Sequence, residues 1–227
     1  MLDRSFDVLL PQPEKKPTAF RFGLLFFLGV LCFLATQVFT RVPLLGWLQR
    51  EPGFLVWAIP NALLSGVVIA LSAGVFEETG RFAIRALLLK TAPTGISEPV
   101  IFGLGHGICE AVWIFLLSWS VMRTLDPSQF FLPIVERILA ITIHVGLSVM
   151  IWNGFQVNKR LRYLALAILA HGLIDAAIPV AGSLGVSAFA LEGLFAVAAV
   201  GLLIYVFYSR KYYRKEDTHE EKNLSIP

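Results

Sequence analysis

The sequence predicts an all-α membrane protein, a polytopic bundle of about six transmembrane helices with short interfacial helices. Hydrophobic residues make up 56% of the 227 residues and charged residues only 15%, and the mean hydropathy is +0.72. A soluble domain needs about 25% charged residues. The apolar runs here continue for about twenty residues, as a spanning helix requires. A membrane β-barrel would instead alternate polar and apolar positions over about ten residues.

Six segments are long and apolar enough to span a membrane. They are 22–40, 54–76, 99–122, 133–157, 163–180 and 186–209. Residues 1–21 form a polar N-terminal lead-in without a small-residue cleavage site, so we expect the first span to be retained and not removed as a signal peptide. Residues 22–209 then form a single transmembrane domain, and 210–227 a charged tail. The segment 82–90 is amphipathic, which is typical of a helix at the membrane interface.

The basic residues predict the orientation. With six spans, fifteen of the 19 Lys and Arg residues fall on the side that holds both termini. Cytoplasmic loops carry an excess of Lys and Arg, so we expect both termini in the cytoplasm. Basic residues that border membrane helices also account for the pI near 9.0. We therefore expect contact with membrane lipids and no nucleic acid.

Ionisable side chains lie within or at the ends of these spans, where each costs at least about 2.5 kcal/mol at the bilayer centre. They are Glu77, Glu78 and Arg81 at the end of the second span, His106 and Glu110 in the third, His144 in the fourth, and His171 and Asp175 in the fifth. The third and fifth spans both carry the pattern His-Gly-x-x-acid, whose i,i+4 spacing puts both side chains on one helix face. We expect one polar cluster inside the bundle, in its cytoplasmic half.

Imidazoles and carboxylates in one cluster are compatible with several functions. They are the ligands of a zinc site in which a further carboxylate activates water. A glutamate acting as general base would need no metal. A proton- or metal-ion-coupled transporter would use the same groups as a relay, and a haem protein would use two of the histidines as axial ligands. A non-catalytic scaffold or immunity protein that retains the motifs is the remaining alternative.

The motifs also carry a family resemblance. Glu-Glu-Thr-Gly-Arg (77–81), Phe-Gly-Leu-Gly-His-Gly-Ile-Cys-Glu (102–110) and His-Gly-Leu-Ile-Asp (171–175) follow one another on successive spans. Their order resembles the EExxR / FxxxH / HxxxN-or-D pattern of the CPBP (Abi) clan, which includes the type II CAAX prenyl proteases. Together with the stretch ERILAITIHVGLS (136–148), they more closely resemble the YhfC family of intramembrane metalloproteases. Asp175 replaces Asn and Glu110 is an additional acid, so CAAX specificity does not carry over.

The resemblance implies an intramembrane endopeptidase of a prokaryotic cell membrane, acting on a membrane-protein or lipid-anchored peptide substrate. Glu77 would be the general base, supported by Glu78 and Arg81. The implied metal ligands, most plausibly for zinc, are His106, His144, His171 and Asp175. Glu110 would serve as a further catalytic group or ligand. The clan's members differ between metal-dependent and glutamate-only mechanisms, so both remain open here.

Other polar residues in the spans favour structural roles. Glu136 and Arg137 are expected to form an ion pair near the outer edge of the fourth span, and Glu192 stands alone in the sixth. Cys32 and Cys109 lie in apolar runs 77 positions apart without a CxxC partner, and we expect both to be free thiols that behave as small hydrophobic residues.

Overall fold

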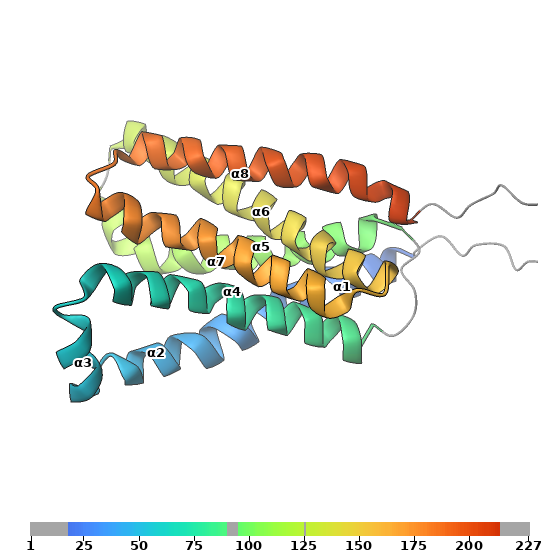
Figure 1. The fold of residues 1–227 in the computed structure, drawn as a ribbon. Helices are drawn as coiled ribbons and strands as arrows, with labels where there is room; N and C mark the ends of the chain where they lie inside the picture. The colour runs from blue at the N-terminus through green and yellow to red at the C-terminus, as the bar shows by residue number, and fades with distance from the viewer. Residues whose placement is uncertain (1–17, 90–94, 125, 214–227) are drawn as a thin grey trace, which may run out of the picture.

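The computed structural model describes residues 18–89, 95–124 and 126–213, which contain helices and turns and no strand (Figure 1). The elements in chain order are α1 (Ala19–Phe33), η1 (Leu34–Arg41), α2 (Val42–Leu48), α3 (Pro52–Ala58), α4 (Ala62–Leu87), α5 (Ser97–Met122), η2 (Pro127–Phe130), α6 (Phe131–Gln156), α7 (Arg160–Ser183), α8 (Ala188–Ser209) and η3 (Arg210–Tyr213). Hydroxyl caps begin two of the spanning helices: Thr18 accepts from the backbone of Arg21, and Ser187 from that of Ala190. Such caps satisfy N–H groups that a helix start leaves without a partner.

Six helices in the described residues are long and apolar enough to cross a membrane, which confirms the predicted fold class. The first is a continuous 30-residue helix that comprises α1, η1 and α2; the others are α4, α5, α6, α7 and α8 with η3. The helix α1 begins and α8 ends at the same end of the bundle (Figure 1). We call this the terminal end, and the opposite end the distal end. Residues 1–17 of the predicted lead-in and 214–227 of the tail lie outside the described residues.

The predicted bounds of the second span, 54–76, are wrong. The chain there forms the short helix α3, turns at residues 59–61, and starts α4 only at Ala62. Pro60 lies in the turn, and a proline removes a helix hydrogen bond. At its other end α4 continues through Glu77, Glu78 and Arg81 to Leu87, and these three side chains are buried inside the bundle. The helix α4 therefore includes residues 82–87 of the segment that was expected to form a helix at the membrane interface.

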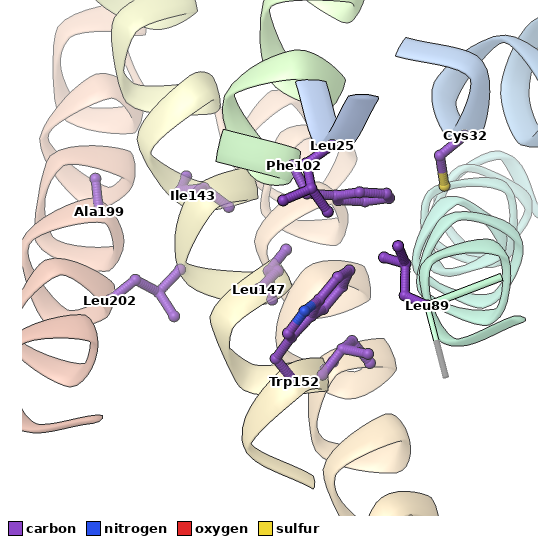
Figure 2. Close-up of a cluster of buried hydrophobic side chains, with 11 residues drawn as sticks. Leu25, Cys32, Leu89, Phe102, Ile143, Leu147, Trp152, Ala199 and Leu202 are labelled. Carbon is purple, nitrogen blue, oxygen red and sulfur yellow. The ribbon is translucent and has the colours of Figure 1, made fainter. Parts of the chain in front are cut away.

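The packing of the helices separates an apolar zone from a polar one. The most extensive contacts are α4 with α7, α1 with α5, α5 with α6, and α6 with α8. Figure 2 shows a buried apolar cluster that includes Leu25, Phe102, Leu147 and Trp152. Phe102 precedes His106 in α5 by one turn, and Leu147 and Trp152 follow His144 in α6. This cluster therefore fills the bundle on the terminal side of the intramembrane histidines.

Candidate metal centre

The middle of α4 supplies two carboxylates and the guanidinium that faces them. Arg81 Nη1 donates to Glu78 Oε1 at 2.7 Å, and Arg81 Nη2 lies 3.4 Å from Glu77 Oε2. All three residues are at most 1% exposed. The spacings i,i+3 and i,i+4 put them on one face of α4. A cation within reach of both carboxylates offsets part of the desolvation cost of burying their charges.

Two glycines let neighbouring helices approach this face closely. A Cβ on Gly74 would lie 2.6 Å from the backbone oxygen of Ile168 in α7, nearer than any side chain tolerates. A Cβ on Gly107 of α5 would lie 2.9 Å from Cα of Ile141 in α6. Small residues at such crossings bring membrane helices into backbone contact. They allow His171 of α7 to reach α4 and let the histidines of α5 and α6 meet.

The histidines of α5 and α6 lie side by side over Glu77. His106 Nε2 is 2.8 Å from Glu77 Oε2, and the rings of His106 and His144 have centroids 4.9 Å apart. His144 Nδ1 accepts from Arg81 Nη2 at 2.6 Å, since a guanidinium only donates. A neutral His144 then carries its proton on Nε2, which contacts Glu110 Oε2. Because the two rings are this close, no porphyrin fits between them, and His106 and His144 are not the pair of axial ligands that a haem protein would need.

His171 contacts a different carboxylate. Its Nδ1 is 2.7 Å from Glu78 Oε1, while Nε2 lies 4.0 Å from Glu77 Oε2 and 3.6 Å from Asp175 Oδ2. A carboxylate at Nδ1 accepts a hydrogen bond from the Nδ1–H group of a neutral imidazole, so the lone pair is on Nε2. The Nε2 atom faces Glu77 and Asp175, and His171 and Asp175 both line the cavity described below.

Four side chains within the described residues have ligand atoms close enough to hold one metal ion. They are Glu77, His106, Glu110 and His144, whose ligand atoms all lie within 4.8 Å of one another. The predicted ligand set shares His106 and His144 with this group, but contains His171 and Asp175 where the structure has Glu77 and Glu110. All eight predicted site residues nevertheless lie around this centre.

A cavity of about 470 Å³ opens from this centre. Its wall includes Glu77, His144 and His171 in the middle of their helices, and Gly66 and Pro179 near the distal ends of α4 and α7. The cavity therefore extends toward the distal end, away from the termini. The apolar cluster of Figure 2 fills the half of the bundle nearer the termini, the half in which the polar cluster was expected, and the cavity opens away from it.

Two cavity residues were missed by the sequence argument. Gln37 Nε2 donates to Glu77 Oε1 at 2.5 Å, and Arg41 Nη1 donates to Gln37 Oε1 at 2.9 Å. Both belong to the π-helical stretch η1, and π-helical turns occur often at functional sites. The signal in the sequence was the polar run Thr36-Gln37 inside an otherwise apolar span. In the sequence, Arg41 is one of the four basic residues on the side opposite the termini.

The remaining polar predictions concern the distal side and the cysteines. The expected pair forms, with Arg137 Nη2 donating to Glu136 Oε1 at 2.5 Å. Arg137 Nη1 also lies 3.6 Å from Glu110 Oε1, which links this pair to the centre.

Cys32 and Cys109 are both free thiols, as predicted.

The fold and the site define a polytopic helical membrane protein with a buried cluster of carboxylates and imidazoles at its centre. A family model described as "YhfC intramembrane metalloprotease" matches residues 14–124 and 117–195, and the chain belongs to this family. It is also 26% identical over 182 residues to "Uncharacterized membrane protein YhfC" of Bacillus subtilis (strain 168), an alignment that covers 66% of this chain and 70% of that protein. No solved structure matches the chain.

Replacing Arg81 with Met should destabilise the protein strongly. The change leaves Glu77 and Glu78 buried without the guanidinium that faces both, and breaking a buried ion pair on one side costs about 3–5 kcal/mol. Thermal unfolding of the purified protein in detergent measures the effect. Arg123→Met, at the exposed end of α5, is the matched control and should unfold near the wild-type temperature. Equal unfolding temperatures for the two variants would contradict this role of Arg81.

Proposed function

We propose that this protein is an intramembrane endopeptidase that hydrolyses peptide bonds of a membrane-protein or lipid-anchored peptide substrate with the help of a divalent metal ion, zinc being the best match. The observation that carries the proposal is the donor set Glu77, His106, Glu110 and His144, drawn from three helices and buried at the centre of the bundle. Two imidazoles and two carboxylates are zinc-type ligands. Membership of a family described as metalloproteases supports the same activity.

The charges around the centre also fit a cation. Four carboxylates lie around it, those of Glu77, Glu78, Glu110 and Asp175. Two guanidiniums partly offset them: Arg81 contacts the first two, and Arg137 lies 3.6 Å from Glu110. A surplus of buried negative charge is costly inside a membrane, and a divalent cation would offset it. The four ligand atoms would have to move closer together to hold an ion at zinc bond lengths of about 2.0–2.2 Å. His144, whose Nδ1 accepts from Arg81, would bind the ion through Nε2 as its other tautomer and would release that hydrogen bond. When bound, such an ion would act as a Lewis acid on the scissile carbonyl and on water.

The geometry favours a division of roles that differs from the one implied by family resemblance. Glu77, at 2.8 Å from His106 Nε2, belongs with the ion-holding side chains. His171 is the better acid–base group, because Glu78 fixes its Nδ1 proton and leaves the Nε2 lone pair facing the cavity. In this role Nε2 would take a proton from the attacking water and return it to the leaving amine. Glu78 would orient the ring and stabilise its charged form, as the carboxylate does in a catalytic triad.

The cavity meets the other needs of hydrolysis within a membrane. A volume of about 470 Å³ admits water and a short stretch of extended peptide. The substrate must be unwound where it is cut, because a helix protects its own backbone amides. The apolar cluster on the terminal side closes the other half of the bundle, so water and substrate would enter from the distal end.

We further propose that the protein lies in a prokaryotic cell membrane with both termini in the cytoplasm, so that the cavity faces outward. The support is the excess of Lys and Arg on the terminal side, since cytoplasmic loops carry such an excess. Fusion of a phosphatase that is active only outside the cytoplasm tests the orientation. A fusion after Pro227 should be inactive, and one inserted after Gly185, between α7 and α8, should be active. The reverse result would overturn the orientation and the direction of substrate entry.

The Glu77→Gln variant should lose cleavage activity, by about a hundredfold, because a neutral amide is a poor ligand for a divalent ion. Mapping of new peptide termini in membranes of cells that express each protein provides the measurement. The wild type should generate termini within or beside transmembrane segments that the variant does not. Glu192→Gln, a change to an α8 glutamate that does not line the cavity, is the matched control and should behave like the wild type. Identical termini for wild type and Glu77→Gln would contradict the proposed activity.

A further inference from the structure

Arg41 places a guanidinium in the cavity wall between the distal end and the metal centre. It lies at the end of η1 and donates Nε to Ser72 Oγ at 2.8 Å, Nη2 to Ile69 O at 2.6 Å and Nη1 to Gln37 Oε1 at 2.9 Å. Ser72 and Ile69 belong to α4, so these bonds hold the side chain against the helix that carries Glu77. The guanidinium is therefore fixed in place and not free to extend to the membrane surface.

The partners of Arg41 are all neutral. Within residues 18–89, 95–124 and 126–213, no carboxylate oxygen is recorded within 4.0 Å of it, whereas Arg21, Arg81 and Arg137 each pair with a glutamate. Its three bonds use three of the five N–H groups of a guanidinium. Two N–H groups thus remain for a ligand on a cation that has been partly withdrawn from water.

The rest of the cavity wall would repel an anion. The lining carboxylates are Glu77, Glu110, Glu136 and Asp175, and the lining guanidiniums are Arg41 and Arg137. Arg137 already contacts Glu136 at 2.5 Å and Glu110 at 3.6 Å. Of the two lining guanidiniums, that of Arg41 is the one with no recorded carboxylate contact among the described residues, so it is the cation of the wall that could stabilise an incoming anionic group.

Arg41 also lies at a defined distance from the proposed site of cleavage. Its α4 partners Ile69 and Ser72 precede Glu77 by eight and five residues, which corresponds to about 8–12 Å along the helix. An extended peptide covers about 3.3–3.6 Å per residue. A group bound at Arg41 would thus lie about three residues from a bond held at Glu77. Gln37, which bonds to both Arg41 and Glu77, forms the wall between the two positions.

From this arrangement we propose that Arg41 is the recognition site for a carboxylate of the substrate peptide, and that the bond cleaved lies about three residues from that carboxylate. The inference rests on the proposed peptidase function. The carboxylate belongs either to the free C-terminus of the peptide or to an aspartate or glutamate side chain, since both offer the same oxygen pair to a guanidinium fork.

Peptide binding to the full-length protein in lipid nanodiscs tests the proposal. Three fluorescent apolar peptides of one sequence are compared by anisotropy: one with a free C-terminal carboxylate, one with a C-terminal amide, and one with the amide and a single internal glutamate. They are measured with the wild type, Arg41→Gln, Arg41→Lys and the control Arg50→Gln. Arg50 is exposed beyond the end of α2. Mass spectrometry of the same samples identifies any cleaved bond.

The wild type should bind at least one of the acidic peptides about tenfold or more tightly than the neutral one, as a hydrogen bond to a charged group predicts. Preference for the free C-terminus or for the internal glutamate identifies the source of the carboxylate. Arg41→Gln should abolish the preference, Arg41→Lys should retain part of it, and Arg50→Gln all of it. Cleaved acidic peptides should be cut about three residues from the carboxylate.

Equal binding of acidic and neutral peptides by the wild type would overturn the inference even if Arg41→Gln does not fold. A preference that persists in folded Arg41→Gln would overturn it as well. A carboxylate preference without cleavage of any peptide would contradict the peptidase function and leave the binding site standing. Cleavage without a carboxylate preference would support the peptidase function and overturn the binding site at Arg41.

Discussion

The arrangement of the site depends on keeping several carboxylates charged at the centre of a membrane bundle. Glu77 and Glu78 are at most 1% exposed and adjacent in sequence, so their burial requires positive or hydrogen-bonding partners. Arg81 faces both, while His106 and His171 each contact one of them. These partners come from three helices, and glycines at the crossings let those helices approach. The electrostatic requirement of α4 thus fixes where α5 and α7 lie.

The two halves of the bundle differ in composition on either side of this cluster. On the terminal side, the packed rings of Phe102 and Trp152, with centroids 4.9 Å apart, leave an apolar core under the cluster. On the distal side, polar groups of η1, α4 and α7 line the cavity. In the proposed function, the packed half would hold the proposed metal ligands in place, and the cavity of the other half would admit water. A hydrolytic site within a membrane needs both, because water must reach the scissile bond without entering the apolar core of the bundle.

Much of this could be predicted from the sequence, and the failures have physical causes. The i,i+4 pairs at His106 and His171 predicted side chains on one helix face, and the structure brings them to one centre. The end of the second span was misplaced because Glu77 and Arg81 resemble interfacial charges until their partners on other helices are known. The direction of the cavity and the part played by Gln37 depend on packing between helices and on the π-helical register of η1. Neither feature leaves a periodic pattern in the sequence.

The metal content of purified protein tests most directly the claim that Glu77, His106, Glu110 and His144 hold a divalent ion with His171 outside the set. After dialysis against a weak chelator, the wild type should retain about one zinc-class ion per chain, as a site with protein ligands from several helices does. His171→Ala should retain the same amount and His144→Ala far less. A wild-type content well below one ion in active protein, or equal loss in the two variants, would contradict the account.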